Sequence, residues 1–386
     1  MIYLDHNATT PVRPEVLDAM LPFLKDGFGN PNSVYLAGQR TRKAVEDARR
    51  QVAALLNCKH EDEVVFTSCG SESDVLAISG GAWQAFDDTK GARRRLVSSP
   101  IEHDAVRGQL TLLKRRGFEL DLLAVDRHGL VDPGSLAAVL GPQTALVSVM
   151  HANNEVGTIQ PIAQLAALSR AQGALFHTDA VQSAGKVPID VQGLGVDLLA
   201  ISGHKLNAPK GVGALYVRRG VRLVQGITGH QEKNRRGGTE NVASIVGFGK
   251  ACELAAAELD ASARHYETLR AKLIGGFLQI PGTRLNGHPE ERLANCAHFS
   301  ISGVDGHHLV VALDLEGICV SAGPACSSGS SLPSHVLTAM GVDAKLATGS
   351  LRVSFGWSST EADIDRLLAA LRPAIEKLRR VPAGSL

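Results

Sequence analysis

The sequence lacks closely spaced cysteines and long hydrophobic runs. No Cys-x-x-Cys pair occurs, which argues against a disulfide framework and a structural zinc site and is typical of a cytosolic protein. No apolar run approaches the length of a membrane span, and the first residues show no signal-peptide pattern. We therefore expect a cytoplasmic protein that does not associate with membranes. The six scattered cysteines are Cys58, Cys69, Cys252, Cys296, Cys319 and Cys326.

The chain also lacks an excess of charge of either sign. It has 40 basic and 39 acidic residues, which gives a net charge of +1. This balance gives no electrostatic argument for nucleic acid or an anionic membrane as a partner. The hydrophobic share of 44% and the charged share of 20% are those of a soluble globular protein. At 386 residues the chain is too long for one ordinary core, so we expect two or three domains.

Short β-rich runs alternate with amphipathic stretches through the middle of the chain. This alternation predicts an α/β fold with a mainly parallel sheet covered on both faces. In such sheets ligands bind beyond the carboxyl ends of the strands. We expect strands at 63–67, 95–99, 144–150, 174–179, 196–202 and 213–217, and helices at 44–56, from 72, at 104–114 and at 162–172.

After about residue 260 the pattern changes to one long helix followed by separate strands. We expect a helix at 264–277, strands at 297–301 and 351–355, and a last helix that begins at Thr360, with Asp363 completing a capping arrangement. This part is predicted to form a smaller α+β domain together with the first residues of the chain. The predicted domains are 16–258 for the large one, and 1–15 with 259–386 for the small one.

Two of the predicted buried strands end in a charged residue. Asp179 closes one of them, and Lys205 follows the other in Ser202-Gly203-His204-Lys205. A lysine and a carboxylate at the same sheet edge suit pyridoxal phosphate (PLP), which needs an amine for its Schiff base and a carboxylate for its pyridinium nitrogen. Ser202 and His204 could hold the phosphate, and Gln182 could reach the phenolic oxygen. Alternatively, Lys205 is a solvated loop residue and Asp179 caps the next helix.

Two further stretches suit the same cofactor. The small-residue turn 67–72, with Gly70 and Ser71, would place backbone amides at a helix start, where anions bind, although it could be an ordinary βα turn. In that turn Cys69 is interpreted as a small filler. His103 could lie on the pyridine face and move protons, or be a structural histidine. No histidine pair or carboxylate cluster suggests a metal, so we expect none.

Cys326 lies in the Ser/Gly-rich stretch 321–331, where nothing bulky is present to bury it. A solvated thiol on a loop is suited to attack a substrate and hand over its product. Arg352 alternates with apolar neighbours in a predicted strand. It could be an edge charge, but a planar bidentate donor is also what an amino-acid carboxylate requires.

Taken together, these stretches resemble the cysteine desulfurases of the NifS/IscS type, which are fold-type I PLP enzymes similar to class V aminotransferases. The resemblance runs essentially from end to end. The Thr-Ser-Cys-Gly turn and the run His-Lys-Leu-Asn-Ala-Pro-Lys-Gly favour the NifS branch. The matching stretches are 3–10, 29–31, 67–74, 152–155, 177–182, 202–205, 237–241, 333–335 and the surroundings of Cys326 and Arg352.

The resemblance implies a large PLP domain with a sheet of the seven-stranded type, a small domain that carries the catalytic cysteine loop, and a homodimer. It implies that Lys205, His103 and Cys326 are catalytic. It implies that Arg352 and Asn154 bind the substrate carboxylate, and that Thr239 reaches the phosphate of the neighbouring subunit. The cofactor-binding residues implied by the resemblance are Gly70, Ser71, His103, Asn154, Asp179, Gln182, Ser202, His204, Lys205 and Thr239.

The activity implied by the resemblance is the conversion of L-cysteine to L-alanine. The sulfur would remain as a persulfide on Cys326 and pass to an iron–sulfur scaffold or another sulfur-acceptor protein. An aminotransferase of the same class needs no nucleophilic thiol, so Cys326 argues against that activity. Selenocysteine as the substrate and a non-catalytic scaffold for cluster assembly are two further hypotheses. The sequence departs from the family at Ser71, at Tyr35, at 228–232 and at 322–324, where Pro324 should stiffen the loop.

Overall fold

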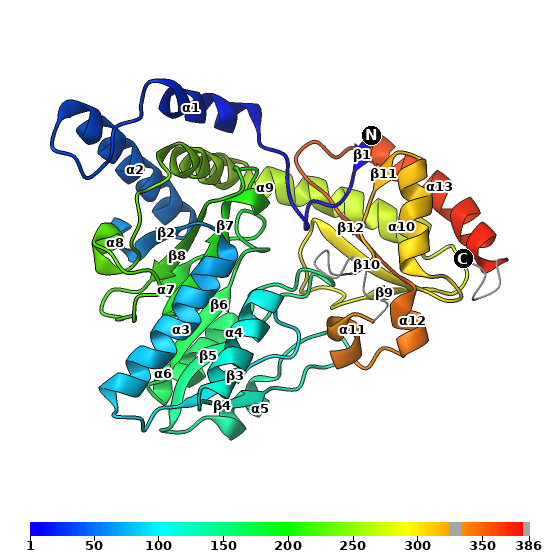
Figure 1. Cartoon of the computed structure of the whole chain (residues 1–386). Coiled ribbons are helices and arrows are strands. Elements are labelled where there is room, and N and C mark those ends of the chain that lie inside the picture. Colours follow the sequence, from blue (N-terminus) through cyan, green and yellow to red (C-terminus); the bar gives the residue numbers. More distant parts are fainter. Residues whose placement is uncertain (324–332, 381–386) are drawn as a thin grey trace.

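The computed structural model describes residues 1–323 and 333–380 (Figure 1). Its centre is a seven-stranded sheet in the order β2-β8-β7-β6-β5-β3-β4, in which only β8 runs antiparallel to its neighbours. The prediction of a mainly parallel, seven-stranded α/β fold is confirmed. The strands are β2 (Val64–Thr67), β3 (Arg95–Ser98), β4 (Glu119–Leu122), β5 (Thr144–Ser148), β6 (Leu175–Asp179), β7 (Leu198–Ser202) and β8 (Gly213–Val217).

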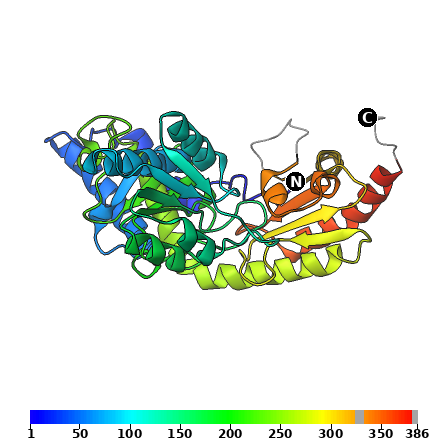
Figure 2. The ribbon, with the colours of Figure 1, turned by 90° about the horizontal axis from the view of Figure 1, so that it is seen from below.

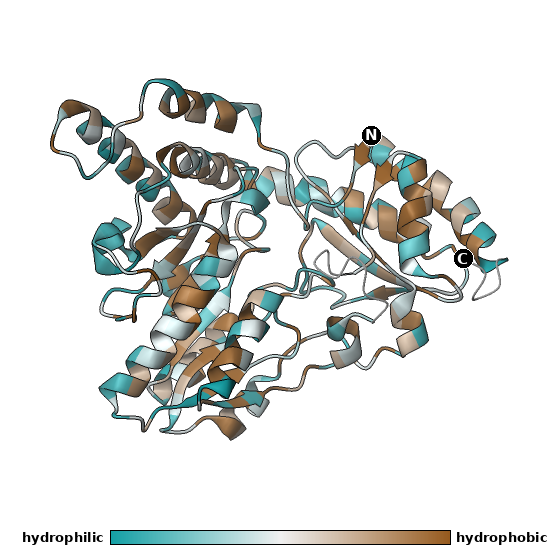
Figure 3. Ribbon diagram, viewed as in Figure 1, coloured by the Kyte–Doolittle hydropathy of each residue, from teal (hydrophilic) through white to brown (hydrophobic). Residues whose placement is uncertain are grey.

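Successive residues of these strands pack into two different hydrophobic clusters. Val97, Val147 and Leu199 belong to one cluster, whereas their neighbours Leu96 and Leu146 belong to the other. This alternation follows from the two-residue period of a strand, and it buries the sheet on both faces. In Figure 3 the central strands are accordingly mostly hydrophobic, whereas the helices carry both hydrophobic and hydrophilic positions.

One face of the sheet is covered by α3 and α4, and the other by α1, α2, α5, α6, α7 and α9. The helix predicted at 44–56 is longer than expected and begins at residue 36. The helices are α1 (Pro14–Lys25), α2 (Leu36–Leu55), α3 (Gly70–Asp88), α4 (Asp104–Arg115), α5 (Pro133–Val139), α6 (Ile162–Ala171), α7 (Val191–Leu194), α8 (Gln231–Asn234) and α9 (Val242–Phe277), with short 3-10 turns at Glu61–Glu63 and Gly203–Lys205.

The C-terminal part has its own antiparallel sheet, in the order β12-β10-β9, and a separate hydrophobic cluster that includes Leu4. Its last helix is capped by Thr360 and Asp363 as predicted. The elements are β9 (Thr283–Asn286), β10 (Cys296–Ile301), β12 (Ser350–Ser354), α10 (Gly306–Leu315), α11 (His335–Ala339), α12 (Ala344–Thr348), α13 (Glu361–Arg379) and the paired strands β1 (Ile2–Tyr3) and β11 (Ile318–Cys319).

Helix α9 continues unbroken from the seven-stranded part to the three-stranded part (Figures 1 and 2). The prediction of a helix at 264–277 was therefore wrong about its start, which lies at Val242. Gly249 lowers helix propensity but is needed, because a Cβ there would lie 2.7 Å from the Cβ of Ala48 on α2. The domain boundary predicted at 258 falls inside this helix, and the division into two domains stays a prediction. No helix in the described ranges is long and apolar enough to span a membrane.

Candidate active site

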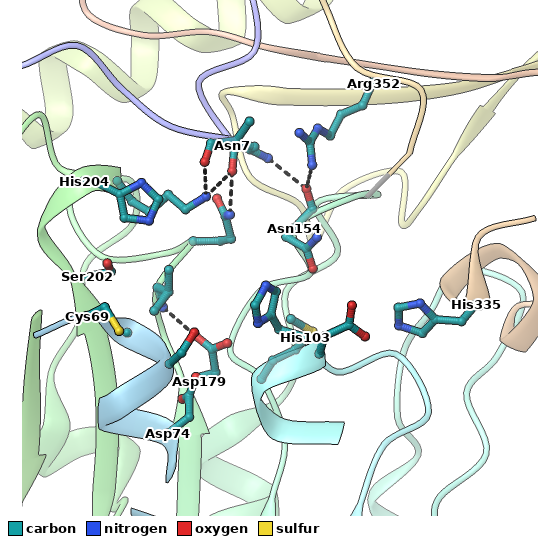
Figure 4. A pocket seen from close by; sticks show the side chains of 18 residues that line it. Asn7, Cys69, Asp74, His103, Asn154, Asp179, Ser202, His204, His335 and Arg352 are labelled. Carbon is teal, nitrogen blue, oxygen red and sulfur yellow. Dashed lines mark hydrogen bonds between the residues drawn. The ribbon is translucent and has the colours of Figure 1, made fainter. Parts of the chain in front are cut away.

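A cavity of about 270 Å³ lies beyond the carboxyl ends of β6 and β7, where the two parts of the chain meet (Figure 4). Most of the side chains predicted for the site come together there, although they are far apart in the sequence. Thr239 does not line this cavity, and Cys326 lies outside the described residues. The predicted site residues that line the cavity are Gly70, Ser71, His103, Asn154, Asp179, Gln182, Ser202, His204, Lys205 and Arg352.

Lys205 follows β7 in a short 3-10 turn and lines the cavity. Its Nζ donates hydrogen bonds to the carbonyl oxygens of Asn7 and Ala8, the latter at 2.7 Å. Burial lowers the pKa of Lys205 to about 7, and the charge of Lys186 contributes in the same direction. A large share of the Lys205 side chains is therefore a neutral amine near neutral pH, and only the neutral amine can act as nucleophile or base.

Asp179 ends β6 on the same side of the sheet and accepts a hydrogen bond of 2.8 Å from the Val181 amide. Burial raises its pKa, whereas the charges of His103 and Lys205 act in the opposite direction. Asp74 lies next to it in Figure 4, and burial together with the charge of Asp179 raises the pKa of Asp74 well above its usual value. We therefore assign the negative charge of this pair to Asp179, which has the compensating donors.

His103 is the N-cap of α4, and its Nδ1 accepts a hydrogen bond of 3.2 Å from the Ala105 amide. An accepting Nδ1 has no proton, so in the neutral ring the proton is on Nε2. The ring points into the cavity between Asp179 and His335 (Figure 4). This position suits an imidazole that moves a proton within the cavity.

The start of α3 forms the end of the cavity that suits an anion. Gly70 and Ser71 open this helix, and a Cβ at Gly70 would lie 2.7 Å from Val181 Cγ2, so the turn tolerates only glycine without a shift. Ser202 Oγ is buried there and has no hydrogen-bond partner among the described residues. His204 lines the same wall, and its Nδ1 lies 3.1 Å from Thr9 Oγ1. A helix start with an unpartnered hydroxyl fits a bound phosphate.

Arg352 reaches the opposite wall of the cavity from β12 and is almost fully buried. Its guanidinium donates to Asn154 O at 2.9 Å and to Asp5 Oδ1 at 2.7 Å, whereas its Nε has no partner in the described ranges. A buried guanidinium with an unused donor fits a carboxylate ligand. The alternative that Arg352 is an exposed edge charge is excluded by its burial.

Gln182 and Asn7 form the wall beside Lys205. Gln182 Nε2 donates to the Asn7 carbonyl at 3.0 Å, and Asn7 Nδ2 donates to the Asn154 carbonyl at 3.2 Å. Sequence reasoning assigned no role to Asn7, to Asp74, to Lys186 or to His335. Asn7 and Asp74 lie inside stretches on which the family resemblance rests, but only the fold shows what they contact.

Thr239 lines a second cavity, of about 140 Å³, behind the turn that contains Ser68. Within one chain it therefore lies on the other side of the turn that opens α3. Its predicted role in a neighbouring subunit stays a prediction. No group of three or more His, Cys, Asp or Glu side chains that could hold a metal occurs in residues 1–323 and 333–380.

The residues present fit PLP. A lysine amine, a buried carboxyl group and a helix start suited to an anion line one cavity, and they match the aldehyde, the ring nitrogen and the phosphate of this cofactor. Gly70 lets the start of α3 lie close to Val181 and Ser202, and within the described ranges Ser202 offers an unpartnered hydroxyl. The arrangement therefore defines a PLP enzyme of fold type I.

Comparisons with known proteins agree with this assignment. The family Aminotransferase class-V matches residues 2–367. Cysteine desulfurase IscS of Methanosarcina thermophila is 47% identical over 98% of this chain and 93% of its own length. Cysteine desulfurase NifS of Azotobacter vinelandii is 42% identical over 98% of this chain and 94% of its own length. The solved structure of a NifS-like protein superimposes with a TM-score of 0.89, at 36% identity over 98% of this chain and all of that one.

The chain belongs to the class V aminotransferase family, whose members use PLP, and within it to the cysteine desulfurases of the IscS and NifS type. The predicted family, enzyme class and cofactor are confirmed. Relatives of both names match over nearly the whole chain, so the preference for the NifS branch stays a prediction.

Proposed function

We propose that the protein converts L-cysteine to L-alanine and holds the sulfur as a persulfide on Cys326. The observation that carries this proposal is that Lys205 and Arg352 line the same cavity. One supplies an amine at the position of the cofactor aldehyde, and the other supplies a buried guanidinium for the carboxylate of an amino acid. Relatives named cysteine desulfurase, at 42–47% identity, support sulfur removal as the reaction.

The side chains divide the work as follows. Arg352 binds the substrate carboxylate, and Lys205 takes the proton from Cα, because burial has lowered its pKa to about 7. When bound, PLP would supply an electron sink, and Asp179 would hold the proton on its ring nitrogen. His103 moves a proton between the substrate and the solvent side of the cavity. The reaction balances as L-cysteine plus protein thiol giving L-alanine plus protein persulfide.

Cys326 lies outside the described residues, so its part in the reaction rests on the family resemblance. The thiolate attacks the substrate sulfur, the Cβ–S bond breaks, and the electron pair of that bond remains on the alanine fragment, which is then protonated. The persulfide sulfur then passes to an acceptor protein, for which an iron–sulfur scaffold or another thio-cofactor pathway is the proposed destination. We also propose a cytoplasmic homodimer in which Thr239 reaches the phosphate of the neighbouring subunit.

The test is a reaction with purified protein, PLP, L-cysteine and a reducing thiol. We expect alanine and sulfide in equal amounts, and no turnover by Lys205→Ala, because no other lysine of the described residues lines the cavity. Wild-type protein that binds PLP but releases no alanine from cysteine would refute the proposal.

A further inference from the structure

Lys186 is a second lysine beside the cavity and is not part of the chemistry described so far. Its ammonium group is turned inward, where Nζ donates to Gln182 Oε1 at 3.2 Å and to Asn7 Oδ1 at 3.5 Å. Within the described ranges no carboxylate lies at ion-pairing distance from it. Since the contacts of Lys186 in the described ranges are with amide oxygens, ion pairing does not explain why this lysine is buried.

The contact with Lys186 fixes the orientation of the Gln182 amide. An ammonium group has only donors, so the Gln182 atom that faces it is the oxygen. The amide nitrogen must then face the other way, where it donates to the Asn7 carbonyl at 3.0 Å. Gln182 also lines the cofactor cavity. Without Lys186 the amide could turn over and present an acceptor to the cavity, which would repel an anionic oxygen of a bound ligand.

Asn7 extends the arrangement to Lys205. Its side-chain oxygen accepts from Lys186 and, at 3.1 Å, from Asn295 Nδ2. Its backbone carbonyl accepts from both Gln182 and Lys205. One residue therefore connects the two lysines through hydrogen bonds, and a shift of Asn7 would move the carbonyl that holds Lys205.

The two lysines also approach each other directly. Both line a small cavity of about 50 Å³ behind Lys205, which has room for ordered water. Burial lowers the pKa of Lys186 to about 8, and the charge of Lys186 in turn lowers the pKa of Lys205. The other charged or titratable groups that face this pair are Asp5, His6, Asp179, His204, Cys296 and Arg352.

We propose that Lys186 is a positioning residue for the reaction: it aims the Gln182 amide nitrogen into the cofactor cavity and, through Asn7, holds Lys205 in place. The inference rests on the proposed function, since it assumes that PLP occupies this cavity. Lys186 itself does not touch the reacting atoms.

The test compares Lys186→Met, Lys186→Arg and Gln182→Leu, the double variant Lys186→Met/Gln182→Leu, and the control Lys250→Met. Lys250 lies on α9, forms an ion pair with Glu253 and is not among the residues that line the cavity, so it reports on the loss of a lysine as such. The measurements are the PLP dissociation constant, the pH at which the visible absorbance of bound PLP titrates, and kcat and KM for cysteine. Thermal unfolding without PLP shows whether each variant is folded.

For Lys186→Met we expect PLP binding about tenfold weaker and an upward shift of the absorbance titration by about one pH unit, because a nearby positive charge is lost. Lys186→Arg should restore much of the affinity, since it keeps charge and donors. Lys186→Met should weaken PLP binding less in the Gln182→Leu variant than in the wild-type protein, because the two residues act together.

Unchanged PLP affinity and an unchanged titration in folded Lys186→Met would overturn the inference. So would fully additive effects of the two substitutions on affinity, because Lys186 would then not act through Gln182. Each result is distinct from failure of the proposed function, which shows in the wild-type protein as absent alanine release.

Discussion

The Ser334 hydroxyl donates a hydrogen bond of 2.6 Å to Glu155 Oε2 and so ties the start of α11 to the buried turn after β5. Glu155 has no solvent exposure, and its Oε1 has no hydrogen-bond partner among the described residues. Burial raises the pKa of this carboxyl to about 7, although the Ser334 hydrogen bond and the charge of Arg352 act against that rise. Residues 333–335 are among the stretches on which the family resemblance rests. The structure gives Ser334 a role, because its hydroxyl is a hydrogen-bond donor to the buried Glu155 carboxyl group.

This pKa predicts a stability change with pH. The folded-state pKa of Glu155 lies above its unfolded value, so the folded protein binds more protons between about pH 4.5 and 7. The free energy of unfolding should therefore fall as the pH rises through this window. We expect the wild type to lose about 2–3 kcal/mol relative to Glu155→Gln between pH 5 and pH 8. Chemical unfolding at both pH values measures this difference.

Glu316→Gln is the matched control for this experiment, because Glu316 is an exposed carboxylate that pairs with Arg366. It should follow the wild type within about 0.5 kcal/mol at both pH values. Equal pH dependence of the wild type and Glu155→Gln would show that Glu155 titrates normally in the folded protein.

A second prediction concerns the turn that opens α3. Gly70→Ala places a Cβ 2.7 Å from Val181 Cγ2 and 3.1 Å from the Cβ of Ser202, so the phosphate-binding turn must shift. We expect PLP affinity to fall by about tenfold or more, measured by fluorescence or dialysis. Gly275→Ala is the control, because no atom lies within 4 Å of its added Cβ on α9. That change should leave PLP binding alone and raise stability by about 0.5–1 kcal/mol. Equal PLP affinity of Gly70→Ala and Gly275→Ala would show that Gly70 is not part of the PLP site.

The third prediction tests substrate recognition by Arg352. Arg352→Lys keeps the charge but cannot donate to Asn154, to Asp5 and to a carboxylate from a planar fork. KM for cysteine should rise about 10- to 100-fold, with a smaller change in kcat. Arg366→Lys, at a surface pair, should leave both constants unchanged. A KM within twofold of the wild type for Arg352→Lys would place the carboxylate elsewhere.

The site residues at the strand ends could be predicted from the sequence, because an apolar run that is followed directly by a charged residue is visible within a few positions of the chain. Asp179 and Lys205 carried this signal, and the structure places both at the carboxyl edge of the sheet. Arg352 was predicted because it interrupts an apolar strand, although its burial was not evident. The last helix was found from its capping pair, which involves residues only three positions apart.

The remaining features depend on contacts between distant segments. Asn7 holds Lys205, 198 positions away, and Lys186, 179 positions away, and no local pattern shows either pair. The first turns of α9 were missed because Gly247 and Gly249 reduce helix propensity. Their small size instead serves close packing against α1 and α2, which is a property of the assembled fold.

The fourth prediction tests whether Thr239 acts across a dimer interface. The experiment uses a mixed dimer of one Lys205→Ala subunit and one Thr239→Ala subunit. If Thr239 contributes to the active site of the other subunit, one active site lacks both side chains and the other active site has both. We expect one PLP per mixed dimer to bind with wild-type affinity and about half of the wild-type turnover. If Thr239 serves its own subunit, both sites are impaired, and no site binds PLP with wild-type affinity.

The fifth prediction separates the thiol from the cofactor site. Cys326→Ser should bind PLP and cysteine as the wild type does, because every described residue that lines the cavity is unchanged. Alanine and sulfide release should fall to background, since an alcohol near neutral pH is a far poorer nucleophile toward sulfur than a thiolate. Mass spectrometry of wild-type protein treated with cysteine should find one extra sulfur on the peptide that contains Cys326. An extra sulfur on Cys69 or Cys319 instead, with Cys326→Ser still active, would assign the nucleophile to another cysteine.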